Sequence, residues 1–199
     1  ADGPMKESVD LPDGTKWKNI VTPEKSKVAE TLDEFRGAYK YNFMDENVRA
    51  FYAAVPVQTQ WDDHEVLNNW SGSKVLPDAY KERHIEVLAA RAARAFHEYM
   101  PIPLMPTEPE RVYRRIPSGP LLDVFMLDMR TYRGPNGPNL ETEEGGVAAF
   151  LGAEELAWLK RELTVSTATW KVIAADMPLS LVVRKDKGWL EQAAQEGDG

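Results

Sequence analysis

The chain has 199 residues, of which 43% are hydrophobic, a formal net charge of −8 and no cysteine. This length and composition allow one sizeable hydrophobic core, so a single domain is expected. The negative charge argues against an electrostatic surface for duplex nucleic acid, and the lack of cysteine excludes disulfides, thiolate catalysis and cysteine-based zinc sites.

The first half of the chain is predicted to contain an irregular arm, three helices and one strand. Residues 1–26 carry turn signals such as Leu11-Pro12-Asp13-Gly14 and form the arm, in which only Trp17, Ile20 and Val21 offer side chains for burial. Thr22 followed by Pro23 is typical of a helix N-cap with proline in the first turn. The predicted elements are a helix from this cap to about residue 39, a helix over 45–54 with Val48, Phe51 and Tyr52 on its apolar face, a buried strand over 55–61, an exposed and mobile loop over 68–77, and a helix over 79–99 capped by Asp78.

The second half is predicted to add three strands and a helix. Residues 101–110 contain four prolines, which favour an extended connector. The predicted elements are strands over 112–116, 121–129 and 170–175, a helix over 154–163, a flexible loop over 134–146, and a polar tail with one short helix near residues 189–195. The alternation of helices and strands favours an α/β fold with a layered sheet, closed by elements outside the chain.

A run of acidic and basic groups follows the predicted strand over 55–61. It consists of Asp62-Asp63-His64-Glu65, and Asn68-Asn69 lies just behind it. Carboxylates suit divalent and trivalent cations, and imidazole either ligates or transfers protons. In phosphoester cleavage a metal activates water while a nearby acid protonates the leaving group. The alternative is a solvated turn with one histidine; the preceding strand and the asparagine pair favour a site.

Arg130, Tyr132 and Arg133 lie at the end of another buried strand. Two guanidinium groups there are suited to holding a phosphate. The alternative is that they form ion pairs with Asp123 or Asp128, or lie over the sheet. Asp128 and Asp176, also near strand ends, are further candidate ligands, although Asp176 is better suited to capping or pairing.

Three segments together resemble a known family. They are Trp61-Asp62-Asp63-His64-Glu65-Val66-Leu67-Asn68-Asn69-Trp70, Leu127-Asp128-Met129-Arg130-Thr131-Tyr132-Arg133-Gly134-Pro135-Asn136, and Leu151-Gly152 with Trp158-Leu159 and Trp170-Lys171-Val172-Ile173. In this order and spacing they resemble the PhoD-like alkaline phosphatases. The resemblance implies phosphomonoesterase or phosphodiesterase activity, a metallophosphoesterase-type layered β-sandwich with flanking helices, and a metal cluster that contains iron and calcium or another pair of di- or trivalent ions.

The resemblance also implies roles for individual residues. Asp63, with Asp62 beside it, is expected to bind metal, although Asp62 stands where the superfamily motif has glycine. His64 is expected to contact the phosphate or the leaving group, and Arg130 to face the phosphate. The expected substrate-binding residues are Asn68, Asn69, Tyr132 and Arg133.

Residues 1–199 are expected to be the central part of one such domain. The family's Gly-Asp-x-Ile-Tyr segment is expected before Ala1 and its Asp-Val-His segment after Gly199. The predicted partner is a small phosphorylated substrate, with no nucleic-acid surface and no membrane contact. A periplasmic or secreted location is expected from the family, although no signal peptide is visible. The alternatives are a catalytically incomplete remnant that serves as an acidic scaffold or small-anion-binding domain, and a chain that pairs with separate polypeptides.

Overall fold

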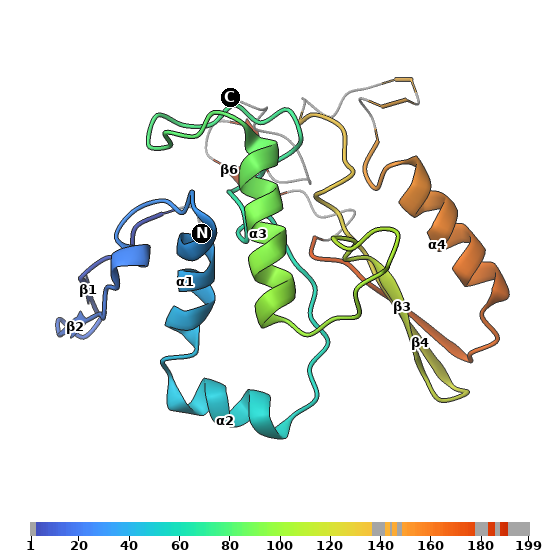
Figure 1. Cartoon of the computed structure of the whole chain (residues 1–199), viewed down its shortest axis with the longest axis horizontal. Coiled ribbons are helices and arrows are strands. Elements are labelled where there is room, and N and C mark those ends of the chain that lie inside the picture. Colours follow the sequence, from blue (N-terminus) through green and yellow to red (C-terminus); the bar gives the residue numbers. More distant parts are fainter. Residues whose placement is uncertain are drawn as a thin grey trace.

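Two helices that run in the same direction and a small mixed sheet organise the computed structural model of the chain. It describes residues 3–136, 142–143, 145–146 and 149–177, together with the backbone of 183–185 and 188–190. Helices α1 (Leu32–Asn42) and α3 (Ile85–Tyr99) run side by side (Figure 1) and enclose most of the larger hydrophobic cluster, in which Phe35, Leu88 and Phe96 are buried. The Tyr39 and Tyr99 rings stack with centroids 5.2 Å apart at the ends of these helices.

The sheet has the order β3-β4-β5. Strands β3 (Arg114–Ser118) and β4 (Leu122–Met126) form an antiparallel hairpin, and β5 (Trp170–Ala174) lies parallel to β4. The crossover from β4 to β5 contains α4 (Ala153–Val165), because parallel neighbours need a long connection. In Figure 1 the hairpin lies between α3 and α4. A second cluster, with Phe125, Leu127 and Trp158, fills the α4 side.

The remaining elements are short. Strands β1 (Ser8–Asp10) and β2 (Lys16–Lys18) form a hairpin in the amino-terminal arm, and β6 (Val183–Lys185) pairs with β7 (Gly188–Leu190). A 3-10 turn, η1, covers Pro23–Lys25, and α2 covers Glu46–Ala54.

The structure contains both helices and a sheet, so the predicted α/β class is confirmed. None of the helices in the described residues combines the length and the apolar character that crossing a bilayer requires.

Three predicted elements differ from the structure. The helix predicted from Thr22 to residue 39 is split into η1 and α1, because Thr31 and Glu34 form a capping box that starts a new helix. The helix predicted over 79–99 begins only at Ile85. The backbone N–H groups of Lys81 and Glu82 donate to Oε1 of Glu30, at 2.6 and 2.9 Å, and this holds residues 79–84 in a non-helical path.

Residues 55–61, all of which the structure describes, form no strand, so that prediction is wrong. Hydrogen bonds from side chains fix this segment, and they replace the backbone hydrogen bonds that a strand would make. Arg114 donates to the Thr59 carbonyl at 2.7 Å, and Gln60 donates to the carbonyls of Leu127 and Ala174 at 2.7 and 2.9 Å. The segment therefore runs across the ends of β4 and β5.

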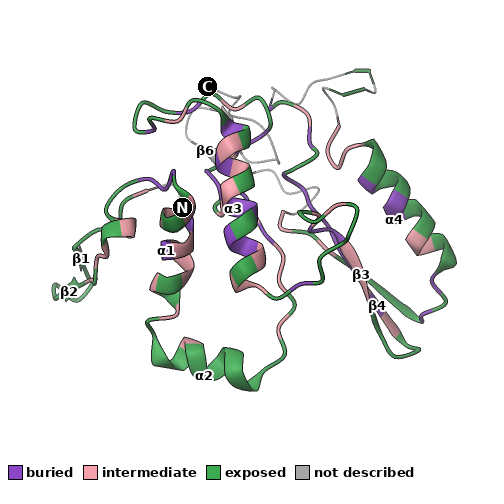
Figure 2. Ribbon diagram, in the orientation of Figure 1, coloured by how far each residue is buried: buried purple, intermediate pink, exposed green. Residues whose placement is uncertain are grey.

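Burial also departs from the sequence pattern. Figure 2 shows α2 as almost entirely exposed, and Phe51, placed on its predicted apolar face, is 50% exposed. Trp17 and Ile20 in the arm are exposed as well. In contrast, the loop over 68–77 was expected to be exposed, yet Trp70 and Ser71 are buried.

Two predictions fall largely on residues that the structure does not describe. The loop predicted over 134–146 is described only at residues 134–136, 142–143 and 145–146. The short helix predicted near 189–195 meets β7 at residues 189–190, which are extended, and its other residues lie outside the description.

At the edge of the sheet, β5 carries exposed apolar side chains. Among the described residues it pairs only with β4. Trp170 is 70% exposed, and Val172 and Ile173 are exposed too. The apolar run that predicted a buried strand therefore lies on a sheet edge that has no second partner strand among the described residues.

Candidate functional site

A buried arginine, Arg130, lies at the centre of a group of carboxylates. Its side chain is 2% exposed. In the sequence Arg130 follows β4, and Asp176 follows β5. Because β4 and β5 are parallel, their carboxyl ends meet at one edge, where open α/β sheets place ligand sites. Arg130 Nε lies 3.3 Å from Oδ2 of Asp176.

The sequence-predicted acidic pair completes this group. Arg130 Nη2 lies 3.3 Å from Oδ1 of Asp62 and 3.6 Å from Oδ2 of Asp63. It also contacts the sulfur of Met177 at 2.6 Å. The structure thus brings Asp62, Asp63 and Arg130 together, and the Arg130 side chain pairs with these two residues and with Asp176, not with Asp123 or Asp128. Its Nη1 is buried and has no hydrogen-bond partner among the described residues.

Asp128 fixes the backbone on both sides of the site. Its Oδ1 accepts hydrogen bonds from Nε1 of Trp61 at 3.0 Å and from the backbone N–H groups of Arg130 and Thr131 at 3.1 and 2.9 Å. Asp128 and Gln60 together hold the segment that precedes Asp62 at the ends of β4 and β5. Asp128 is therefore a structural residue of the site in this arrangement.

Asp63 closes a tight turn over residues 63–69. The Val66 and Leu67 N–H groups donate to its carbonyl, both at 2.8 Å, and the Asn69 N–H donates to its Oδ2 at 2.5 Å. Asn69 has φ of 49°, in the left-handed region that asparagine tolerates. Its carbonyl accepts from Nδ2 of Asn136 at 2.7 Å. The backbone of Asn69 thus shapes the turn, while Asn68 is exposed.

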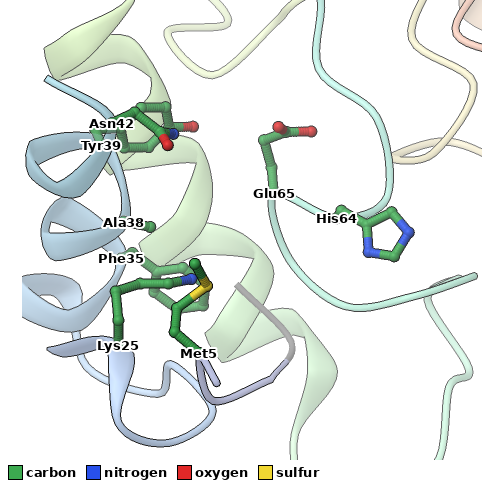
Figure 3. A pocket seen from close by; sticks show the side chains of 8 residues that line it. All are labelled: Met5, Lys25, Phe35, Ala38, Tyr39, Asn42, His64 and Glu65. Atoms are coloured by element: carbon green, nitrogen blue, oxygen red, sulfur yellow. The ribbon is translucent and has the colours of Figure 1, made fainter. Parts of the chain in front are cut away.

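His64 lies on the exposed rim of this turn. Its side chain is 57% exposed, and Nε2 is 3.8 Å from Oδ1 of Asp63. A cavity of about 170 Å³ separates the turn from α1 and the arm, and Figure 3 shows the His64 imidazole pointing away from α1. The imidazole is therefore accessible from the solvent side of the turn.

The carboxylates of Asp62 and Asp176 titrate as a pair. Burial, together with a hydrogen bond to Asp62, raises the pKa of Asp176 to about 7, although Arg130 opposes the rise. Burial opposes ionisation of Asp62 as well, but hydrogen bonds from Asp176 and from the Asp63 backbone, with Arg130 nearby, keep the pKa of Asp62 below its ordinary value. Asp176 is therefore the member that holds a proton near neutral pH.

Glu155 is a buried carboxyl group that the sequence analysis missed. It lies on α4, accepts a hydrogen bond from the Asp128 N–H at 2.8 Å, and is fully buried. Burial raises its pKa to about 8. Glu155 shares a helix face with the inward Trp158 and Leu159, because positions i, i+3 and i+4 align. An acidic residue on the inward face of this helix is the sequence signal that could have identified Glu155.

Tyr132 and Arg133 each contact an aromatic ring. The Tyr132 ring meets the Tyr113 ring edge-on at 5.6 Å, and the Arg133 guanidinium lies over the Phe150 ring, 5.4 Å from its centroid. Binding of the substrate by Tyr132 and Arg133 remains a prediction, and so does binding by Asn68 and Asn69.

Asp62 and Asp63 are the residues expected from the sequence to bind metal. The described part of the chain contains no group of three or more histidine or acidic residues arranged to hold a metal ion. The carboxylates of Asp62 and Asp63 instead face the guanidinium of Arg130. In this arrangement the residues do not fit a metal.

Comparisons with known proteins agree with the resemblance. A family model described as PhoD-like phosphatase matches residues 1–199. Alkaline phosphatase D of Bacillus subtilis (strain 168) is 32% identical over 170 residues, which cover 80% of this chain and 29% of that protein. A solved structure of PhoD is 28% identical and superposes with a TM-score of 0.62, covering 83% of this chain and 34% of that one. The chain thus spans about a third of the length of these relatives.

Proposed function

Because this chain belongs to the PhoD-like phosphatase family, we propose that it supplies part of an active site that hydrolyses phosphate esters. One observation carries the proposal: a nearly fully buried guanidinium lies at the carboxyl ends of two parallel strands, beside a histidine-bearing turn. A buried arginine at such an edge is suited to binding a phosphoryl group.

Each side chain has a distinct part in the proposed reaction. Arg130 stabilises the negative charge that develops on the phosphoryl oxygens, with Nη1 as its available donor. His64, on the exposed rim, transfers a proton to the departing alcohol. Asp63 keeps the turn over residues 63–69 in shape, so that His64 stays on the rim.

Metal dependence is a further part of the proposal, with iron and calcium as the expected ions. A bound metal supplies an activated water molecule in phosphoester hydrolysis. The described residues do not fit a metal as they stand, so ligands beyond Asp62 and Asp63 are required. The layered β-sandwich of the metallophosphoesterases and a periplasmic or secreted location remain predictions, as does the choice between phosphate monoesters and diesters.

Hydrolysis of p-nitrophenyl phosphate and bis(p-nitrophenyl) phosphate tests the proposal. The assay is carried out, with elemental analysis of bound metal, on this chain and on any longer protein that contains it. His64→Ala is expected to lower kcat about 100-fold or more, as loss of a general acid does. His84→Ala is the matched control, because His84 is an exposed histidine before α3. Full activity of the His64→Ala and Arg130→Met variants would exclude the assigned roles.

A second candidate is a domain that binds small anions without turnover. The pairing of Arg130 with Asp62 and Asp63 favours it, since these two carboxylates already have a counter-ion. This candidate predicts that inorganic phosphate binds, that elemental analysis finds no metal, and that neither ester is hydrolysed. An acidic scaffold without anion binding is distinguished from it by a null phosphate titration.

A further inference from the structure

A cavity of about 360 Å³ lies between α3 and the segments that carry Trp61 and Thr131. Its volume is within the range of about 300–1,000 Å³ that is typical of small-molecule sites. Arg130 and its three carboxylate partners are not among the described residues that line it. It is therefore a separate cavity, although Trp61 directly precedes Asp62 and Thr131 directly follows Arg130 in the sequence.

Aromatic side chains form the deep end of the cavity. Trp61 and Trp70 line it and are only 2% and 3% exposed, whereas Tyr132, which also lines it, is 37% exposed. The two indoles meet edge-on, with ring centroids 5.8 Å apart. Asp128 fixes the Trp61 indole through their hydrogen bond at 3.0 Å, and Tyr113 contacts the Tyr132 ring edge-on. The aromatic walls are therefore in place before any ligand binds, which lowers the entropic cost of binding.

Helix α3 borders the cavity with small side chains. Ala89, Ala90 and Ala93 line it, and each extends only one methyl group from the helix. Methyl groups and aromatic rings together give largely apolar walls, so the cavity favours a ligand with apolar surface. A larger side chain at position 90, which is exposed, would reduce the space that a ligand can occupy.

Two carboxylates without a cationic partner lie at the mouth of the cavity. Glu86 and Glu110 line it, are both exposed, and form no ion pair with any residue that the structure describes. In contrast, Glu98 on the same helix pairs with Arg36 at 2.6 Å. The first turn of α3 favours an acidic residue at position 86, but Glu110 lies in no helix. No lysine, arginine or histidine is among the described residues that line the cavity, so its mouth is negatively charged.

We propose that this cavity binds a small organic cation, with an aryl-substituted quaternary ammonium ion as the representative ligand. The proposal goes beyond the proposed function and does not rest on it. Aromatic rings attract a cation through the negative faces of their π systems. Carboxylates at the mouth of an apolar cleft raise the local concentration of cations and repel anions. A neutral aromatic molecule gains only the apolar contacts, so the cavity discriminates between ligands by their charge.

Isothermal titration of the chain with three ligands that share a phenyl ring tests the proposal. The ligands are benzyltrimethylammonium, benzyl alcohol and benzoate. The cation is expected to bind with a Kd about tenfold or more below that of the neutral alcohol, and benzoate is expected not to bind. Absence of benzyltrimethylammonium binding at up to about 10 mM, or equal affinity for either of the other ligands, overturns the proposal.

Replacing both carboxylates at the mouth tests their part in binding. The double variant Glu86→Gln with Glu110→Gln is expected to raise the Kd for benzyltrimethylammonium by about threefold or more. The matched control is Glu46→Gln with Glu154→Gln, because these are exposed acidic residues in the first turns of α2 and α4. It removes the same net charge away from the cavity and is expected to leave the Kd unchanged. Equal effects of the two double variants overturn the proposal.

Filling the cavity tests the location of the ligand. Ala90→Leu is expected to raise the Kd for benzyltrimethylammonium by about tenfold, because leucine occupies part of the space beside α3. Ala157→Leu is the control, since Ala157 is an exposed alanine on α4, outside the cavity. Leucine is a good helix former, so both variants are expected to fold, and thermal melts check this. The same Kd in both variants overturns the proposal. These titrations measure binding alone, so failed ester hydrolysis counts against the proposed function without bearing on the cation site.

Discussion

The indole Nε1 of Trp61 donates a hydrogen bond to Oδ1 of Asp128 at 3.0 Å, across 67 positions of sequence. The same oxygen accepts hydrogen bonds from the backbone N–H groups of Arg130 and Thr131. One carboxylate oxygen therefore sets the distance between the acidic pair and the arginine. The geometry of the site depends on this oxygen as much as on the charged groups themselves.

Asp128→Ala is expected to destabilise the chain by about 3 kcal/mol, because two buried donors and one part-buried donor lose their acceptor. Asp128→Asn keeps one carbonyl oxygen in place and is expected to cost about half as much. Urea unfolding followed by circular dichroism measures both. Equal losses for the two variants would show that the charge of Asp128, and not its acceptor role, stabilises the fold.

Gly152, at the start of α4, is expected to tolerate no side chain. It has φ of 75°, and an added Cβ would lie 2.8 Å from Cβ of Tyr132 and 2.9 Å from its carbonyl oxygen. Gly119 has φ of 65° with open space around it. Gly119→Ala should therefore cost about 1 kcal/mol for conformation alone, and Gly152→Ala about 2–4 kcal/mol. Thermal melts of the two variants compare them, and a similar loss in both would contradict the predicted contact with Tyr132.

Glu155 is expected to make stability fall as pH rises. Burial raises its pKa from 4.5 to about 8 in the folded chain, so the folded state binds a proton more tightly than the unfolded state. The contribution is complete below pH 4.5 and is lost between about pH 4.5 and 8, up to about 5 kcal/mol. Glu155→Gln mimics the protonated form and should flatten this decline.

Urea unfolding at pH 5, 6, 7 and 8 measures the effect of Glu155. Glu154→Gln is the control, because Glu154 is the exposed neighbour on the same helix. Its pH profile is expected to follow that of the unmodified chain. If the Glu155→Gln profile also runs parallel to the unmodified chain, Glu155 is ionised in the folded state and the prediction fails.

Asn69 is expected to be replaceable by glycine but not by valine. Its φ of 49° is accessible to glycine, whereas a β-branched residue is strained there by about 1–3 kcal/mol. Asn69→Gly should leave the free energy of unfolding within about 0.5 kcal/mol of the unmodified value. Denaturant titration of both variants checks this. An equally large loss in the glycine variant would indicate that the side chain of Asn69, and not its backbone, matters for stability.

Local signals predicted much of the fold. The termini of α2, α4 and β5 agree with the sequence prediction within about two residues, because Asp45 caps α2 and apolar runs mark the other two elements. The failures arose where distant side chains compete with local preference. Glu30 captures the N–H groups that would have started α3 six residues earlier, and nothing in residues 79–84 themselves signals this.

The sequence indicated which residues belong to the candidate site, but not which of them contact one another. Asp62, Asp63 and Arg130 were identified from their positions beside expected strands. That they contact one another depends on β4 and β5 being parallel neighbours, which is a property of the tertiary fold. The strand expected before Asp62 does not form, yet the site still assembles, because Gln60 uses its side chain to bind the ends of both strands.

The edge of β5, which has no second partner strand in the part of the chain that the structure describes, affects how the chain behaves at high concentration. A strand with a free edge and exposed apolar side chains offers unpaired backbone groups to another strand, which makes it a template for self-association. Trp170 sits at the start of this edge with its indole 70% exposed, whereas the chain has six tryptophans in all. A concentration-dependent blue shift of the emission that is lost in Trp170→Phe would show copies of the chain meeting along β5, and dilution would reverse the shift.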